Sequence, residues 1–301
     1  MNKLLIICGA TATGKTKLAI DCAKKLNTEI ISADSQLVYK NLDIGTAKPT
    51  VAEMDGVVHH MIDVIEPRYN FSVSDYCSLA EPILRKLLDN NKVPVICGGT
   101  GFYINSLIYD LSYGNSSANQ IIRNKYNALL KEKGKEYLFG LLLKADPETA
   151  SRLHVNDTKR VIRALEIFEV SGRKKSEIVD NKLPKYNYTA VAIDYPREEL
   201  YDRINRRVDE MFDKGLIEEI HNLIENGITS DNQCMQAIGY KEVLKSIKNG
   251  DNESTMCNII KQNTRHYAKR QITFFKKFEG IIWLKPEDAT TEKVLELFNE
   301  N

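Results

Sequence analysis

The sequence predicts an α/β fold: a P-loop NTPase-like parallel sheet with helices on both faces, together with a mainly helical insertion domain. Three observations predict it. Short apolar runs alternate with helical segments in the N-terminal part of the chain. A glycine-rich phosphate-binding motif joins the first apolar run to the first helical segment. The composition then changes after Tyr113, where a basic and mostly helical pattern begins.

Five short apolar runs are the predicted strands: 4–8, 29–32, 93–97, 187–194 and 280–284. The first three end in polar or glycine-rich turns with the sequences GATATGKT, ADSQ and GGTG. Helical patterns at 15–26 and 74–89 separate these runs, and such alternation predicts parallel strand pairing. Because ligands bind beyond the carboxyl ends of the strands in such sheets, we expect the three turns to form one site.

The predicted domains are a core of residues 1–113 and 186–301 and an insertion of residues 114–185. The insertion contains 15 lysines and arginines against 9 acidic residues. This local excess of positive charge would attract an acidic partner such as a nucleic acid. A second basic stretch, 258–278, has no acidic residue, and its Lys261, Arg265 and Lys269 fall on one helical face. That face predicts either RNA binding or an ordinary solvated surface.

The overall composition excludes several classes of protein. Hydrophobic residues make up 43%, charged residues 28%, and the net charge is +1, so the chain has no general attraction to nucleic acid or membranes. Its six cysteines are scattered without a CxxC pair, which argues against a zinc site or disulfide framework and favours the cytoplasm. The first apolar run is too short for a signal peptide or a membrane span.

The motif G-x-x-x-x-G-K-[ST] is complete and follows a predicted strand. Its glycines allow a tight turn whose backbone N–H groups face phosphate oxygens, and the helix N-terminus adds positive charge. Lys15 supplies a full charge, and the Thr16 hydroxyl is a predicted Mg²⁺ ligand. The predicted diphosphate-binding residues are Gly9, Ala10, Thr11, Ala12, Thr13, Gly14, Lys15 and Thr16.

Other motifs of nucleotide hydrolases are missing from the sequence. No later strand ends in the apolar run and aspartate of a Walker-B site, and there is no NKxD motif. The carboxylate at a strand end near the loop is Asp34, which suits a general base beside a phosphate site. The alternative is that Asp34 caps the next helix.

The motif DSQLVYKNLDIGTAKP at 34–49 is highly specific, and it lies within the first of several longer segments that carry a family resemblance. They read ISADSQLVYKNLDIGTAKP at 31–49, HHMID at 59–63, VICGGTGFYINSL at 95–107, RLHVNDTKRVIRALEIFEVSG at 152–172, MQAIGYKE at 235–242 and TRHYAKRQITFF at 264–275. On these segments and the phosphate loop, the chain resembles the bacterial tRNA dimethylallyltransferases of the tRNA isopentenyltransferase family. The resemblance covers nearly the whole chain.

The resemblance implies transfer of a dimethylallyl group from dimethylallyl diphosphate to N6 of adenine 37, beside the anticodon, with Mg²⁺ as cofactor. It implies Asp34 as the general base, with Lys15 and Thr100 also catalytic. Residues matching tRNA-contacting positions are Asp34, Ser35, Gln36, Leu37, Thr100, Arg123, Lys159, Arg160 and Arg163. The expected partner is therefore the anticodon stem-loop of tRNA, bound by a monomer.

Two residues depart from some relatives: Gln236 stands where others have Arg, and Phe274 where others have Trp. We expect a prenyl diphosphate rather than ATP in the phosphate loop, with the small residues Ala10, Ala12 and Ala33 leaving room for the isoprenoid. Two other functions remain open from the residues themselves. A P-loop small-molecule kinase would keep both the phosphate loop and Asp34, and a nucleotide-gated RNA-binding switch would make no product.

Overall fold

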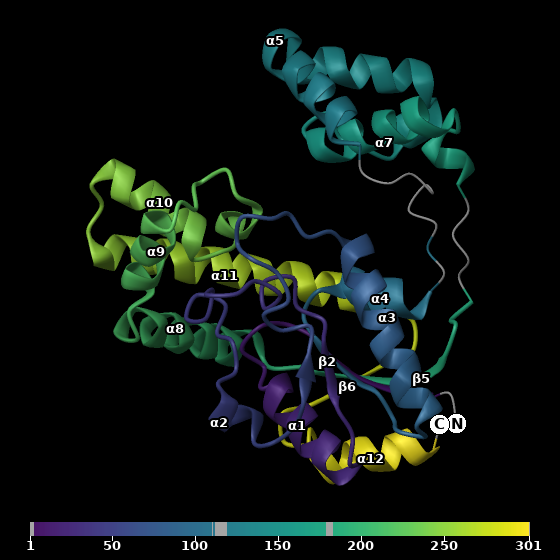
Figure 1. Ribbon diagram of the computed structural model, residues 1–301, viewed down its shortest axis with the longest axis vertical. Helices are drawn as coiled ribbons and strands as arrows, with labels where there is room; N and C mark the ends of the chain where they lie inside the picture. Colours follow the sequence, from purple (N-terminus) through teal and green to yellow (C-terminus); the bar gives the residue numbers. More distant parts are fainter. Residues whose placement is uncertain (1–2, 110, 112–118, 179–182, 301) are drawn as a thin grey trace. The chain divides into compact units, whose positions relative to one another are not determined.

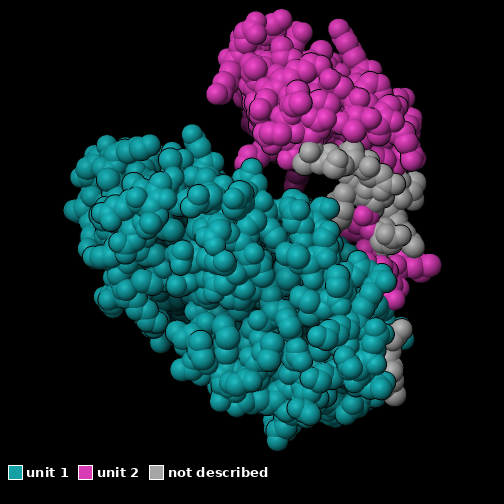
Figure 2. Space-filling view, viewed as in Figure 1, with its two compact units in different colours: residues 1–108, 186–301 teal, residues 109–185 magenta. Residues whose placement is uncertain are grey.

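The structure is a computed structural model that describes residues 3–109, 111, 119–178 and 183–300. The chain divides into two compact units, residues 1–108 with 186–301 and residues 109–185 (Figure 2). The second unit therefore starts at Tyr109, before the boundary at 114 expected from the change in composition. No helix among the described residues has both the length and the apolar character needed to span a membrane.

Six parallel strands form one sheet in unit 1, in the order β3-β2-β4-β1-β5-β6. The strands are β1 (Lys3–Cys8), β2 (Ile30–Ser32), β3 (His59–His60), β4 (Val95–Gly98), β5 (Asn187–Ile193) and β6 (Ile281–Leu284). The side chains of Leu4 to Ile7 are completely buried because β1 pairs on both sides and helices cover both faces. Burial on both faces explains why the inner strands β1, β2, β4 and β5 read as apolar runs, whereas the edge strands β3 and β6 are only partly buried.

Helices lie on both faces of this sheet, as predicted (Figure 1). The helices of unit 1 are α1 (Lys15–Lys25), α2 (Val51–Met54), α3 (Val73–Asp89), α4 (Gly101–Ile108), α8 (Arg197–Asp213), α9 (Leu216–Glu225), α10 (Tyr240–Asn249), α11 (Glu253–Phe275) and α12 (Thr291–Glu300), with the 3₁₀ turn η2 (Gln233–Gln236). Of these, α9 and α10 pack on α8 and α11 rather than on the sheet (Figure 1). On one face, α1 and α12 pack on β1, β4 and β5 around Leu5, Ile7 and Phe298. On the other face, the Tyr76 hydroxyl of α3 donates to the Ser32 carbonyl of β2 at 3.0 Å.

Unit 2 consists of α5 (Gln120–Ala145), α6 (Pro147–Ser151), α7 (Thr158–Ser171) and the 3₁₀ turn η1 (Lys175–Glu177). Its core is built from apolar residues of α5, α6 and α7. Asp146 is buried and accepts hydrogen bonds from the backbone and hydroxyl groups of Thr149 and Ser176. Burial raises the pKa of this carboxyl, but the four hydrogen bonds outweigh burial and lower it to about 2.

The expected basic face on α11 is partly neutralised. Lys261 forms an ion pair with Asp209 of α8 at 2.5 Å, and Arg265 Nη1 donates to Asn205 Oδ1 of α8 at 2.7 Å. Arg265 also lies over the Tyr201 ring, 5.7 Å from its centroid. Two of the three side chains therefore hold α11 against α8, a partner that the pattern of α11 alone could not reveal.

Candidate active site

The phosphate loop turns sharply between β1 and α1. Gly9 and Gly14 have positive φ angles of 127° and 84°, a conformation that glycine adopts without strain. Ala12 has a φ of 63°, in the left-handed region that residues with a Cβ rarely adopt. The Nζ of Lys15 donates to the Ala10 carbonyl at 3.1 Å, across the loop. The loop therefore has the compact shape in which backbone N–H groups and the start of α1 can receive an anion.

Two cations of this site are held in surroundings that disfavour charge. Burial lowers the pKa of Lys15, and the nearby Arg207 lowers it further, against the opposing effects of Cys97 and Asp34. Burial likewise lowers the pKa of Arg207, which Asp34 opposes. Because both cations are incompletely compensated, an anion bound beside them would be stabilised.

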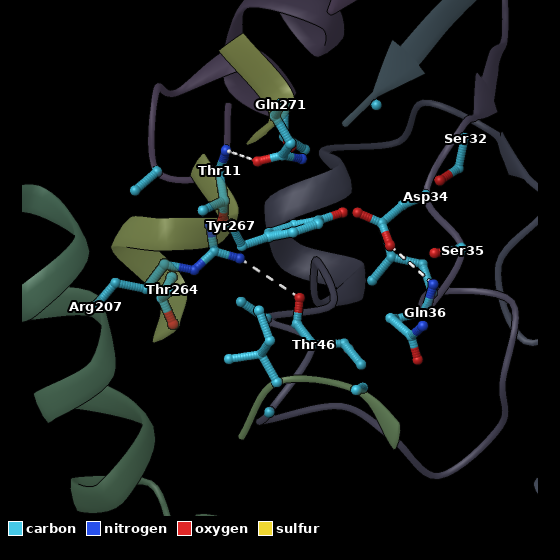
Figure 3. A pocket seen from close by; sticks show the side chains of 18 of the residues that line it. Thr11, Ser32, Asp34, Ser35, Gln36, Thr46, Arg207, Thr264, Tyr267 and Gln271 are labelled. Carbon is cyan, nitrogen blue, oxygen red and sulfur yellow. Dashed lines mark hydrogen bonds between the residues drawn. The ribbon is translucent and has the colours of Figure 1, made fainter. Parts of the chain in front are cut away.

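The arginines of α8 were not predicted from the sequence. Arg207 donates from Nη1 to the Thr11 hydroxyl at 3.3 Å and from Nη2 to the Thr46 carbonyl at 3.4 Å (Figure 3). Arg203 donates from Nε to the Ala12 carbonyl at 2.8 Å. Their spacing of i and i+4 puts both on one face of a helix, and this was the available signal.

Gln271 of α11 connects the phosphate loop to the turn after β4. Its Oε1 accepts from the Thr11 N–H at 2.9 Å, and its Nε2 donates to the Gly99 carbonyl at 2.9 Å. A Cβ on Gly99 would lie 2.2 Å from that Nε2, so the contact requires glycine. Nothing in the helical pattern of α11 indicated this role.

Asp34 lies in a turn just after β2. Its Oδ1 accepts from the Gln36 N–H at 2.9 Å, which orients the carboxylate. Thr100 holds the turn through two hydrogen bonds: its hydroxyl accepts from the Ser35 N–H at 3.0 Å, and its N–H donates to the Ala33 carbonyl at 3.0 Å. Thr100 is not among the residues that line the cavity described below, so its place is that of a support for the turn.

Tyr267 of α11 faces Asp34 across the site. Figure 3 shows the Tyr267 hydroxyl pointing toward the Asp34 carboxylate. Burial raises the pKa of Tyr267, with a further contribution from the negative charge of Asp34, whereas a hydrogen bond with Thr100 lowers it. The phenol therefore stays protonated at neutral pH and forms part of the wall beside Asp34.

A cavity of about 320 Å³ brings the two predicted motifs together. One wall contains residues of the phosphate loop and of the turn after β2, most of them polar: Thr11, Ala12, Lys15, Thr16, Asp34, Ser35, Gln36 and Leu37. Its apolar wall comes mainly from α8 and α11 and includes Ile204, Val208, Met211, Ile238 and Ile260. A second cavity, of about 820 Å³, shares Lys15, Thr16 and Arg207 with the first and is also lined by Gly14.

Some predicted lining residues lie elsewhere. Ala10 is 2% exposed and packs against Leu200, Ile204 and Ala268, and Ala33 is completely buried. The expectation that Ala10 and Ala33 leave room for a ligand was therefore wrong; of the three alanines, Ala12 lines the cavity. The remaining loop residues Gly9 and Thr13 shape the turn, and neither lines the two cavities.

The predicted RNA-contacting residues of unit 2 have their own environment. Arg123 and Arg163 both pair with the buried carboxylate of Glu166, at 3.0 and 2.8 Å. Arg160 lies 3.7 Å from Asp157 and is exposed, and Lys159 is exposed at the start of α7. Arg123 and Arg163 therefore neutralise a buried charge, whereas Lys159 and Arg160 present theirs to solvent.

The predicted metal ligand, Thr16, lines the cavity. Among the described ranges, no group of three or more His, Cys, Asp or Glu side chains could hold a metal ion. Mg²⁺ commonly takes one or two protein ligands and completes its shell with phosphate oxygens and water. The donor set therefore fits a Mg²⁺ that binds together with a diphosphate.

Gln236, one of the two residues that differ from some relatives, also lines the cavity. Its amide donates to the Ser230 carbonyl at 2.7 Å.

A phosphate loop and a carboxylate on one cavity, at the carboxyl edge of a parallel sheet, define a P-loop enzyme. The family model described as IPP transferase matches residues 37–278, and the model described as isopentenyl transferase matches residues 2–66. The chain therefore belongs to the IPP transferase family, and the family resemblance of its motifs is confirmed.

Named relatives span nearly the full chain. A protein named tRNA dimethylallyltransferase from Acetivibrio thermocellus is 43% identical over 98% of this chain and 96% of its own length. One of the same name from Bacillus cereus is 43% identical, with coverage of 98% and 93%. These names favour a transferase over the kinase alternative.

Two solved structures share the fold. The crystal structure of a tRNA isopentenylpyrophosphate transferase from Bacillus halodurans is 40% identical, with a TM-score of 0.74 over 100% of this chain and 95% of that one. The structure of a eukaryotic dimethylallyltransferase acting on tRNA is 29% identical, with a TM-score of 0.81 over 96% of this chain and 74% of that one. They confirm the predicted α/β fold.

Proposed function

We propose that this enzyme transfers the dimethylallyl group of dimethylallyl diphosphate to N6 of adenine 37 in tRNA, next to the anticodon. The observation that carries the proposal is that Asp34 and Lys15 line the same cavity. Asp34 supplies a proton acceptor and Lys15 a cation for the phosphates, which are the two groups that displacement of diphosphate by an amine requires. The names of the relatives support the identity of donor and acceptor.

The phosphate loop and α8 hold the leaving group. The C–O bond of the donor breaks, and its electron pair leaves with the diphosphate, whose negative charge grows. Lys15, Arg207 and the loop N–H groups stabilise that charge because they are fixed before the reaction. Thr16 would hold a Mg²⁺ ion, which would supply additional charge stabilisation when bound.

Asp34 acts on the acceptor. The N6 amine is a poor nucleophile because its lone pair is delocalised into the purine ring. As the new C–N bond forms, the Asp34 carboxylate takes a proton from N6, which contributes roughly 10²- to 10⁴-fold to the rate. The Gln36 N–H and the turn supported by Thr100 keep the carboxylate oriented for this transfer.

The remaining walls suit the two organic groups. Ile204, Val208 and Ile260 offer an apolar surface for the dimethylallyl group and help exclude water from an allylic carbon with cationic character. The adenine must leave the stacked anticodon loop to enter the cavity, at a cost of a few kcal/mol. Ser35, Gln36 and Leu37 would contact it there. Lys159 and Arg160 offer exposed charge for the RNA backbone.

The test is to incubate the enzyme with unmodified tRNA, labelled dimethylallyl diphosphate and Mg²⁺, and to map the labelled nucleoside. The proposal predicts label on N6 of adenine 37 and none on a tRNA with guanine at that position. A kinase would instead need ATP and release ADP. Absence of label in tRNA, or label at another base, would contradict the proposal.

A further inference from the structure

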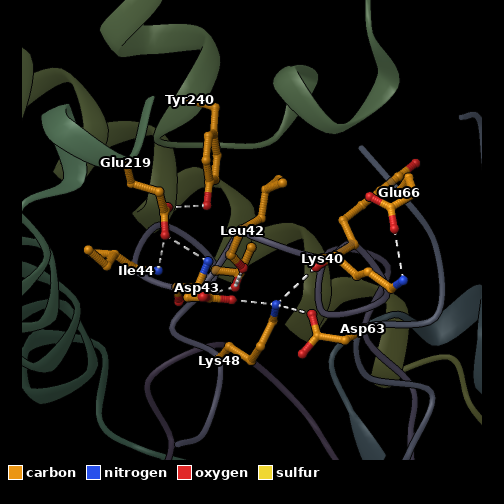
Figure 4. Close-up of polar contacts among 11 residues, drawn as sticks. Lys40, Leu42, Asp43, Ile44, Lys48, Asp63, Glu66, Glu219 and Tyr240 are labelled. Atoms are coloured by element: carbon orange, nitrogen blue, oxygen red, sulfur yellow. Dashed lines mark hydrogen bonds and ion pairs between the residues drawn. The ribbon is translucent and has the colours of Figure 1, made fainter. Parts of the chain in front are cut away.

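The carboxylate of Glu219 binds three consecutive backbone N–H groups from a distant part of the chain (Figure 4). Its Oε2 accepts from the N–H of Asp43 at 2.8 Å and of Ile44 at 2.7 Å, and its Oε1 accepts from that of Gly45 at 3.1 Å. Glu219 lies on α9, while the three N–H groups belong to the DIGTA segment of residues 43–47, here called the 43–47 loop. Charged hydrogen bonds of this kind are among the stronger ones in proteins.

Tyr240, at the start of α10, completes the contact. Its hydroxyl donates to Glu219 Oε1 at 2.6 Å (Figure 4). The hydroxyl end of its ring packs closely on Gly45 of the 43–47 loop, because a Cβ on Gly45 would lie 2.6 Å from Cε2, 2.7 Å from Cζ and 2.8 Å from the hydroxyl oxygen. Tyr240 is completely buried, so its hydroxyl depends on Glu219 as its acceptor.

A second anchor fixes the end of this loop. Lys48 donates from Nζ to the Tyr39 carbonyl at 2.9 Å and forms ion pairs with Asp43 and Asp63. The Lys48 ammonium group is buried on one side of the loop while Glu219 binds the other (Figure 4). Thr46, between the two anchors, therefore has little freedom to move.

Thr46 connects this loop to the diphosphate site. Its carbonyl accepts from Arg207, the residue that also contacts the Thr11 hydroxyl of the phosphate loop. Gly45, Thr46 and Ala47 line the same cavity as Lys15. A shift of the 43–47 loop would therefore remove an acceptor that orients Arg207 and would change the shape of the cavity wall.

We propose that Glu219, assisted by Tyr240, is a positioning residue for the donor diphosphate: it fixes the 43–47 loop so that Thr46 holds Arg207 against the phosphate loop. This inference rests on the proposed function for the identity of the donor. It assigns Glu219 an effect on donor binding rather than on tRNA binding. If Glu219 only stabilised the fold, its loss would lower stability and leave the donor KM of the folded enzyme unchanged.

The test compares three variants. Glu219→Gln keeps the side-chain size but turns an amide N–H₂ toward backbone donors, Tyr240→Phe removes only the hydroxyl, and Glu218→Gln alters an exposed neighbour on α9 as the matched control. The donor KM should rise about tenfold in Glu219→Gln and about threefold in Tyr240→Phe, with the tRNA KM within about twofold. Glu218→Gln should match the wild type in both constants.

Hydrogen exchange gives an independent measurement. The amides of residues 43–45 should exchange faster in Glu219→Gln than in the wild type and Glu218→Gln. A wild-type donor KM in folded Glu219→Gln, whatever its stability, would overturn the proposal. If that variant does not fold, an unchanged donor KM in Tyr240→Phe would overturn it instead. If the wild type modifies no tRNA, the proposed function fails. The role of Glu219 is then tested with inorganic pyrophosphate, whose dissociation constant should rise about tenfold in Glu219→Gln and about threefold in Tyr240→Phe; unchanged constants would overturn the proposal.

Discussion

Replacing Gln271 with methionine removes two hydrogen bonds while keeping a side chain of similar length. The Gly99 carbonyl loses its partner in a buried place, which costs about 1–3 kcal/mol. The Thr11 N–H borders the cavity and can bond to water instead, so losing its hydrogen bond to Gln271 costs about 0.5–1.5 kcal/mol. We therefore expect Gln271→Met to lower the free energy of unfolding by about 1.5–4.5 kcal/mol.

Urea unfolding of the full chain checks this value, with separate probes for the two units because they need not unfold together. A loss below about 0.5 kcal/mol in unit 1 would refute the reasoning. Gln271→Glu separates stability from ligand binding. It keeps an acceptor for Thr11 but adds negative charge beside the phosphate loop, so pyrophosphate should bind at least about tenfold more weakly. Gln271→Met should change that affinity less than about threefold.

Three further predictions concern the ligand, the RNA surface and pH. Transfer should proceed with Mg²⁺ and dimethylallyl diphosphate in the absence of any nucleoside triphosphate; a strict ATP requirement would contradict this. Lys159→Ala should reduce the salt dependence of tRNA binding by about 0.7 in the logarithmic slope, and an unchanged slope would assign Lys159 to a solvated surface. Asp146 has a pKa of about 2 in the folded protein against an ordinary 3.8, so its ionised form adds about 2 kcal/mol to the free energy of unfolding above pH ~4. In urea unfolding, the wild type should lose this stabilisation as the pH falls from 4 to 2, whereas Asp146→Asn should not. Equal pH profiles of the two proteins would refute this prediction.

The inner strands could be predicted because burial on both faces leaves a continuous apolar run, and the edge strand β6 because its four residues are all apolar although only partly buried. The five expected runs correspond to β1, β2, β4, β5 and β6. The sixth strand, β3, escaped prediction because it is two residues long and polar. It lies at the edge of the sheet, where His60 Nε2 and Glu29 Oε2 of the neighbouring segment are 2.7 Å apart, within hydrogen-bonding distance.

The candidate site likewise contains some residues that the sequence could indicate and others that it could not. Lys15, Thr16 and Asp34 could be found because each belongs to a local motif with a fixed spacing. The contacts of Arg207, of Gln271 and of Glu219 with the 43–47 loop could not be found, because these partners lie more than 150 residues away in sequence. The i, i+4 spacing of Arg203 and Arg207 indicates a shared helix face but not what that face contacts. Hydrogen bonds over such separations leave no periodic signal in a single chain, and only the folded arrangement shows them.

The most direct test of the account is Asp34→Asn under single-turnover conditions, with donor binding measured in the same preparation. The variant keeps the side-chain size and an oxygen for the Gln36 N–H, but it cannot accept a proton from N6. We predict a rate of transfer lowered by roughly 10²-fold or more, with the donor dissociation constant nearly unchanged. A near-wild-type rate would show that Asp34 is not the base and would contradict the central claim.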